Sequence, residues 1–202
     1  MSRSRLVIIG TVVSIVAAFG VAPAAQAAED YFLAFQTGST GPAIEGETLD
    51  AVFATRKAIE VESFDWSAAN PVSIGSAGGG AGTGKVKLNE LTVMKRVDSA
   101  SPALFKRVAT GQWFPSMVLS VRRAGAAGAA AVYLTYTFGA VWVTSVSPSG
   151  DGDQMRERVT FAYGSLNQSY RRQTAAGTLT SPVDSTWNQI TNTDVFDTVP
   201  PL

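Results

Sequence analysis

Two residue types that carry much of enzyme chemistry are missing from this sequence. Cysteine is absent from the 202 residues, so disulfides, thiol nucleophiles and thiolate metal sites are excluded. Histidine is absent too, which excludes Ser-His-Asp and Cys-His catalysis and leaves a metal only carboxylate and carbonyl ligands. We therefore expect a non-enzymatic protein with no catalytic residues, no metal and no cofactor.

An excess of charge of one sign is also lacking. The chain has 16 Lys and Arg against 16 Asp and Glu, so its formal charge is zero at pH 7. Without a broad basic field, binding to nucleic acid is not expected. With 46% hydrophobic and 16% charged residues, the composition is typical of one globular domain.

Residues 1–27 have the three-part pattern of a secretory signal peptide. Arg3 and Arg5 form a positive start, residues 6–21 are apolar and uncharged, and an Ala-Gln-Ala triplet precedes a cleavage point at Ala28. An uncleaved membrane anchor is the alternative, but the run is short for a span of about 20 residues. Cleavage leaves 14 basic and 16 acidic side chains, a net charge of −2. We expect a secreted, extracytoplasmic protein with no other membrane span.

Short segments of alternating polarity predict strands along most of the remaining chain. They cover residues 31–36, 58–70, 85–88, 91–97, 114–122 and 155–163, and residues 131–146 give two strands or one long strand bent at Gly139. In the second of these segments the apolar parity changes, which predicts a bulge near Glu62 and Ser63.

One helix is predicted, over residues 102–110. Ser101 precedes it as an N-cap, and Gly111 follows as the residue that ends it. The spacing predicts a buried apolar stripe formed by Leu104, Phe105 and Val108, with Lys106 and Arg107 facing away.

These elements predict a mainly β fold, a small antiparallel β-barrel or two-sheet sandwich with one flanking short α-helix. We expect three parts: the signal peptide over residues 1–27, the barrel domain over residues 28–164, and a partly ordered C-terminal extension over residues 165–202. Within the extension, Trp187 and Ile190 are expected to dock on the core, and the chain from Thr191 onward is expected to fray.

One glycine-rich stretch mimics a nucleotide-binding loop. Gly79, Gly84 and Lys85 satisfy the pattern G-x-x-x-x-G-K. A phosphate-binding loop also needs Ser or Thr next and then a helix, whereas Val86 and an alternating strand follow here. We therefore predict no nucleotide binding.

Other local patterns favour structural roles over binding or catalysis. Glu47 and Asp50 form a possible acid/base pair, but both lie on a predicted loop without a partner, where acids are usually solvated. Asp151 and Asp153 are compatible with weak calcium binding, although a polar hairpin turn accounts for them better. Trp66 favours core packing over a ligand platform.

Six short motifs occur in an order that resembles the Hcp family, the secreted, tube-forming proteins of type VI secretion systems. They are IEGET at 44–48, IEVES at 59–63, GGGAGTGKV at 78–86, KRVDSASPAL at 95–104, VRRAG at 121–125 and VTSV at 143–146. The resemblance spans residues 31–163 and includes the sequence at the predicted start of the helix.

The resemblance implies a barrel of two sheets with a helix at its side, which assembles into hexameric rings that stack into a tube and deliver effector proteins. Tube proteins assembled in the cytoplasm need no signal peptide, so a stand-alone secreted binding or surface module on the same barrel is the alternative. For contacts between stacked rings, the long loop over residues 37–56 is the candidate, through its apolar Ile44, Leu49, Val52 and Phe53.

Overall fold

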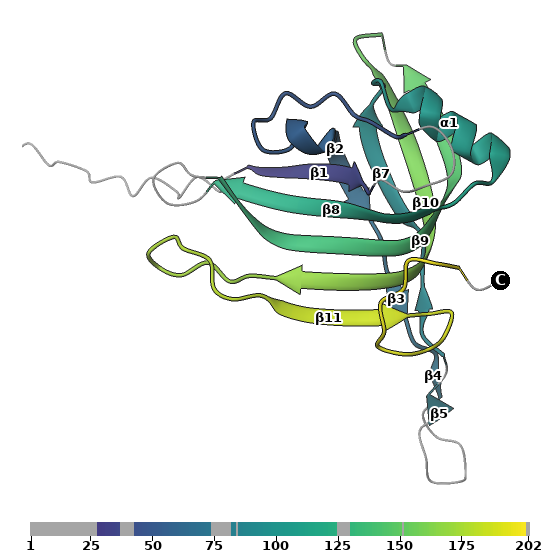
Figure 1. Cartoon of the computed structure of the whole chain (residues 1–202), viewed down its shortest axis with the longest axis vertical. Coiled ribbons are helices and arrows are strands. Elements are labelled where there is room, and N and C mark those ends of the chain that lie inside the picture. The colour runs from purple at the N-terminus through teal and green to yellow at the C-terminus, as the bar shows by residue number, and fades with distance from the viewer. Residues whose placement is uncertain are drawn as a thin grey trace, which may run out of the picture.

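A seven-stranded antiparallel sheet carries the fold in the computed structural model, which describes residues 28–36, 43–73, 82–83, 85–124, 130–150 and 152–200. Its strands are β1 (Glu29–Phe35), β2 (Ile59–Asp65), β7 (Leu91–Arg96), β8 (Phe114–Ala124), β9 (Ala130–Gly150), β10 (Met155–Tyr170) and β11 (Val183–Asn188). Their order is β11-β10-β7-β2-β1-β8-β9, and β9 also pairs with β10. That pairing closes six strands into a barrel and leaves β11 as an added strand (Figure 1).

The barrel closes because β9 and β10 form one long hairpin. Their pairing runs from Gly150 opposite Met155 to Leu134 opposite Tyr170. The sequence left open two strands or one bent strand over residues 131–146, and the structure has one. The positive φ at the bend is at Ala140, with a value of 50°, one residue beyond the predicted Gly139.

Side chains of alternating parity fill the barrel interior, as the sequence pattern predicted. The fully buried ones include Leu33, Leu91, Val93, Met117, Leu119, Phe138, Val159 and Phe161. The register of β2 against β7 shifts between Val61 and Ser63, which confirms the predicted bulge. The mainly β class is confirmed, and the closed barrel is the form it takes.

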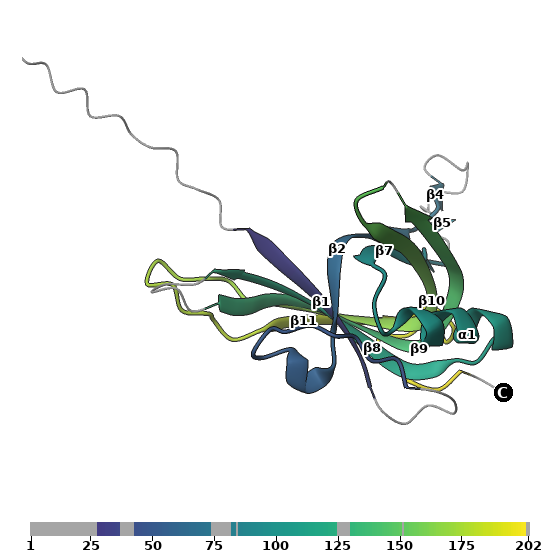
Figure 2. The ribbon, with the colours of Figure 1, turned by 90° about the horizontal axis from the view of Figure 1, so that it is seen from above.

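The single α-helix found in the described residues, α1 (Ser101–Thr110), lies against β9 at the side of the barrel (Figure 2). A short 3-10 helix, η1 (Ala54–Arg56), lies in the loop before β2. Gly111 has a φ of 65° and ends the helix as predicted. Leu104 is fully buried, but Phe105 is 66% exposed and Arg107 is only 1% exposed. The predicted stripe is therefore wrong in two places, because the face that meets the barrel has the i, i+3 spacing of Leu104 and Arg107.

The buried Arg107 has partners inside the protein. Its guanidinium donates a hydrogen bond to the carbonyl oxygen of Trp113 at 3.2 Å and lies 5.9 Å from the ring centroid of Phe114. The long side chain packs its methylenes against the barrel while its charge is held by these groups.

The C-terminal part of the chain is built into the barrel. The predicted boundary at residues 164 and 165 falls inside β10, and Trp187 packs against the core as expected. The predicted fraying is wrong for residues 191–197, because Asn188 and Thr193 form a bridge and the main chain of Asp197 bonds to Ser165. The last two residues of the predicted segment, 201 and 202, lie outside the described part of the chain. Hydrogen bonds to the barrel fix a segment that its polar sequence marked as loose.

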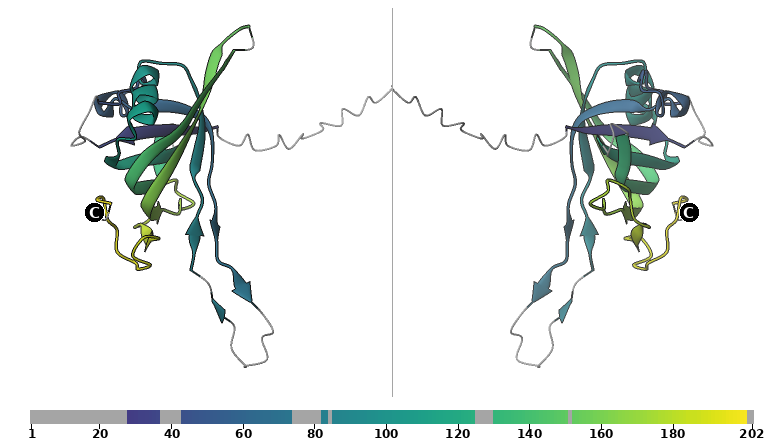
Figure 3. Two further views of the ribbon diagram at one scale, coloured as in Figure 1. Left: turned by 90° about the vertical axis from the view of Figure 1, so that its right-hand side faces the viewer. Right: turned by 90° about the vertical axis from the view of Figure 1, so that its left-hand side faces the viewer.

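A narrow two-stranded ribbon projects from one end of the barrel (Figure 3). It consists of β3 (Ala68–Ala69), β4 (Val72–Ser73), β5 (Gly82–Thr83) and β6 (Lys87–Leu88), in which β3 pairs with β6 and β4 with β5. Its two sides continue from the ends of β2 and β7, so it is an outward extension of two barrel strands. We call this segment the ribbon.

Candidate functional site

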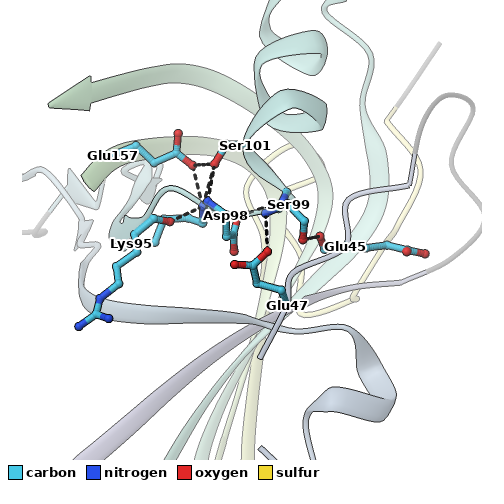
Figure 4. Close-up of polar contacts among 9 residues, drawn as sticks. Glu45, Glu47, Lys95, Asp98, Ser99, Ser101 and Glu157 are labelled. Carbon is cyan, nitrogen blue, oxygen red and sulfur yellow. Dashed lines mark hydrogen bonds and ion pairs between the residues drawn. The ribbon is translucent and has the colours of Figure 1, made fainter. Parts of the chain in front are cut away.

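A buried polar cluster holds the start of α1 against the barrel (Figure 4). At its centre is Lys95 of β7, only 1% exposed, whose ammonium nitrogen lies 2.7 Å from carboxylate oxygens of both Asp98 and Glu157. It also donates to the hydroxyl oxygen of Ser101 and the carbonyl oxygen of Arg96, at 3.3 and 2.8 Å. Strands β7 and β10 and the helix thus meet at one ammonium group.

Ser101 serves this cluster and does not cap the helix as the sequence predicted. Its hydroxyl donates to Glu157 at 2.7 Å and accepts the backbone N–H of Asp98 at 3.1 Å. The residue at the N-cap is Ala100, without a side-chain bond. The carboxylate of Asp98 accepts the N–H of Ala100 at 3.0 Å, so the turn before the helix is held by side chains that also bind Lys95.

The same turn is tied to the loop before β2. The Ser99 hydroxyl donates to the carbonyl oxygen of Glu45 at 2.9 Å, and the backbone N–H of Ser99 donates to the carboxylate of Glu47 at 3.1 Å (Figure 4). Glu47 therefore has a structural partner, and the structure does not bring it together with Asp50 as an acid/base pair.

Asp50, in the same loop before β2, has different partners from Glu47. One of its carboxylate oxygens lies 2.6 Å from the guanidinium of Arg122, and the other accepts the backbone N–H groups of Val52 and Phe53. Burial alone would raise the pKa of Asp50, but the hydrogen bonds from Arg122 and from the two N–H groups outweigh it and hold the pKa below its usual value. Asp50 is therefore a fixed anion that shapes the loop.

The loop carries two of the four predicted contact residues inward and two outward. Ile44 is 7% exposed in the barrel core, and Phe53 is 1% exposed in a small second core, where its ring stacks on that of Phe32 at a centroid distance of 4.0 Å. Leu49 is 95% exposed and Val52 is 56% exposed. The buried pair anchors the loop, and only Leu49 and Val52 are available to another molecule.

The other candidate residues from the sequence are a tryptophan, the glycine-rich stretch and an acidic turn, and part of them lies in the described residues. Trp66 packs against the core with its ring 5.3 Å from that of Tyr136, which agrees with the packing interpretation. Lys85 is followed by strand β6 and not by a helix, although Gly79 and Gly84 lie outside the described residues. Asp151 also lies outside them, and in the described part no group of three or more acidic side chains is arranged to hold a metal ion.

The Lys95 cluster is the feature that sequence reasoning missed. The KRVDSASP motif was visible, but its meaning as an ion-pair centre depends on Glu157, which is 62 residues away in the sequence. The sequence did contain one signal for a buried ion pair: Lys95 is at an interior-facing position of a predicted strand, three residues before Asp98.

Comparisons with known proteins agree on one family. The family model described as "Type VI secretion system effector, Hcp" matches residues 32–170. Protein hcp1 of Pseudomonas aeruginosa is 33% identical over 107 residues, which cover 52% of this chain and 65% of that protein. The alignment thus spans slightly less than two thirds of this curated relative.

Solved structures match over more of the chain. One described as a type six secretion system protein is 29% identical, with a TM-score of 0.73, over 82% of this chain and 99% of the other. Hcp1 from Salmonella typhimurium is also 29% identical, with a TM-score of 0.64, over 83% of this chain and 99% of the other. Among the described residues, no helix is long and apolar enough to cross a membrane.

Proposed function

The chain belongs to the Hcp family of type VI secretion proteins, and from that membership we propose that it is a structural protein that assembles into hexameric rings stacked as a tube. The observation that carries the proposal is the match over residues 32–170, which starts within β1 and ends at the last residue of β10, so it covers five barrel strands in full and the second half of β1. The proposed role requires no catalytic residue and no cofactor.

Two surface features support contacts between copies. The ribbon extends two barrel strands beyond the body of the molecule (Figure 3). The loop before β2 presents Leu49 and Val52 to solvent, and both positions are fixed by the bonds of Asp50 and Glu47. Exposed aliphatic side chains on a fixed loop are suited to burial against a second copy. Because a head-to-tail contact closes into a ring only at certain rotations, a rigid surface is needed.

The proposal is tested on the chain from Ala28 to Leu202. Multi-angle light scattering should give six times the monomer mass, and electron microscopy should show rings at the higher concentrations. A monomer at every concentration up to the millimolar range would reject the tube role while leaving the fold unaffected.

We further propose that the protein is exported after removal of residues 1–27. The predicted cleavage point lies before Ala28, one residue ahead of Glu29, the first residue of β1, so processing would remove no element of the barrel. N-terminal sequencing of the secreted protein should begin within two residues of Ala28. Recovery of the protein with Met1 intact from the cytosol would argue against export by this route.

The signal-like segment favours the second candidate function, a stand-alone secreted module on the Hcp barrel that binds a partner or a surface. Effector proteins are the proposed cargo in the first case only. A ring in the light-scattering experiment favours the tube, whereas a processed, secreted monomer favours the module.

A further inference from the structure

At the end of β11 the chain turns at the base of the ribbon and then runs over the barrel wall at β9 and β10. We call residues 188–199 the C-terminal brace. Its first turn is closed by the bridge between Asn188 and Thr193 and by two backbone N–H groups, of Ile190 and Thr191, that donate to the Asn188 side chain. The turn lies next to β3 at the end of the barrel from which the ribbon leaves (Figure 1).

Gln189 links this turn to both the ribbon and the barrel. Its side-chain oxygen accepts the backbone N–H of Leu88 in β6 at 3.2 Å, and its side-chain nitrogen donates to the carbonyl oxygen of Tyr163 in β10 at 2.6 Å. Lys85 adds a second link, because its ammonium donates to the carbonyl oxygen of Ile190 at 3.2 Å. The two bonds to the ribbon side, from Leu88 to Gln189 and from Lys85 to Ile190, join residues 101 and 105 positions apart in the sequence.

Two glycines of the barrel make room for the brace. A Cβ atom at Gly164 would lie 2.6 Å from a terminal carbon of Ile190, and one at Gly139 would lie 2.1 Å from the carbonyl oxygen of Asp197. The backbone N–H of Gln189 donates to the carbonyl oxygen of Gly164 at 3.0 Å. These close approaches show that the brace occupies a fitted position on the barrel wall.

The ribbon needs support from outside itself. Its ladders β3–β6 and β4–β5 have two residue pairs each, and an isolated two-stranded ribbon is at best marginally stable in water. At its base, the backbone and side chain of Asn89 bond to Ser67 across the ribbon, but these bonds hold its two sides together without fixing its direction. Bonds between the base of the ribbon and the rest of the protein are those of the brace and that of the Tyr163 hydroxyl, which donates to the carbonyl oxygen of Asn89 at 2.8 Å.

We propose that the C-terminal brace, acting through Gln189, is a positioning element that holds the ribbon in one direction relative to the barrel, and that the assembly of copies depends on it. The second half of this inference rests on the proposed ring function. It assigns a role to the C-terminal segment, which the sequence marked only as an extension.

The test compares Gln189→Ala with Gln173→Ala in the chain from Ala28 to Leu202. Gln173 is the matched control, because its side chain also donates to a backbone carbonyl, that of Gly177 at 3.1 Å, but within the extension and away from the ribbon. Amide hydrogen exchange by NMR reports on Leu88, whose N–H loses its acceptor in the first variant only. We expect Leu88 protection to fall roughly two- to tenfold, the range equivalent to one net hydrogen bond, with an accompanying loss of assembly in light scattering.

A third variant separates the two bonds of Gln189. Gln189→Glu keeps an oxygen for the Leu88 N–H but removes the donor to Tyr163, so Leu88 protection should be largely retained while exchange in the brace itself increases. Unchanged Leu88 protection in Gln189→Ala overturns the brace. Lost protection with assembly unchanged overturns its role in assembly. If the wild-type chain does not assemble at all, the ring proposal fails and the exchange data alone decide whether the brace exists.

Discussion

Leu104 and Phe105 are neighbours on α1 with opposite surroundings, and they make a matched pair for measuring how the helix is held. Leu104 is fully buried and Phe105 is 66% exposed. Leu104→Ala should lower the free energy of unfolding by about 2–5 kcal/mol, because it leaves a cavity between α1 and the barrel. Phe105→Ala should change it by less than about 0.5 kcal/mol, as is usual for surface sites. Urea denaturation measures both, and a larger loss from Phe105 would contradict the observed docking.

Lys95 is expected to be a sensitive single position in the barrel wall. In Lys95→Met the carboxylates of Glu157 and Asp98 lose the ammonium group that neutralises them, and removing one partner of a buried ion pair typically costs about 3–5 kcal/mol. Adding Glu157→Gln removes one stranded charge and should recover part of the loss. Arg96→Met, at a neighbouring exposed ion pair, is the control and should have an effect below about 1 kcal/mol. Equal losses from Lys95→Met and Arg96→Met would refute the cluster's role.

Tyr133 makes stability depend on alkaline pH. Burial, followed by the hydrogen bond to Glu29 and its charge, raises the pKa of Tyr133 from 10.0 to about 12. Between those values the unfolded chain has released this proton and the folded chain still holds it. Titration of Tyr133 should therefore lower the free energy of unfolding as the pH rises from about 10 to 12, and should make no contribution to its pH dependence below that window. Tyr133→Phe should make this decrease less steep in thermal melts; an identical pH profile would count against the raised pKa.

Single side chains were harder to predict than the pattern they belong to. The periodicity identified α1 but assigned Phe105 inward and Arg107 outward, since apolar character was taken to decide burial. The charge of Arg107 is instead met by the carbonyl of Trp113 and the ring of Phe114, groups that follow the helix and are brought to it only by folding. Lys95 was missed for the same reason: its partner Glu157 is on another strand.

At the scale of helices and strands, a feature was predicted correctly when neighbouring residues in the sequence determine it. A feature that depends on a side chain far away in the sequence was not predicted. The change of apolar parity in the sequence of β2 predicts its bulge, which the register shift confirms. The glycine at position 111 predicts the end of α1, and it has a positive φ in the structure. The role of Ser101 was predicted wrongly, because its hydroxyl bonds to Glu157, 56 residues away. The positive φ of β9 is at Ala140, next to the predicted Gly139. Gly139 is needed because a Cβ atom there would collide with the carbonyl oxygen of Asp197, and not because of its own φ.

The loop before β2 is the element through which contact between copies is most directly tested. Leu49 and Val52 are exposed, and Ile44 and Phe53 anchor the loop from inside. In the chain from Ala28 to Leu202, Leu49→Ser with Val52→Ser should leave the thermal melt of the monomer nearly unchanged and weaken assembly in light scattering. Val183→Ser is the control, since Val183 is 72% exposed on β11. Assembly that withstands the double change would exclude this loop from the interface without excluding rings.

At the scale of the whole molecule, the mainly β class follows from strand patterns, but the choice between a closed barrel and a two-sheet sandwich does not, and neither does the end of the last barrel strand. The sequence predicted a barrel ending at residue 164, where polar residues become frequent. The structure continues β10 to Tyr170, pairs that stretch with both β9 and β11, and buries Leu166 to 6% exposure. That stretch is mostly polar and pairs with β11 along its whole length, so composition gave no sign of the continuing strand.

This continuity predicts the outcome of truncation. A chain of residues 28–164 lacks the end of β10 and all of β11, so β9 from Leu134 to Gly139 loses its partner on the β10 side, keeps its pairing with β8 and becomes an open edge. Such an edge beside an incompletely covered core should make this chain aggregate or melt without a cooperative transition. A chain of residues 28–200 retains every described pairing and should melt in a single step, because a closed barrel unfolds as one unit. Circular dichroism melts of the two chains decide the matter: a cooperative transition in the shorter chain would mean that the barrel is complete at residue 164 and that the rest is a separable extension.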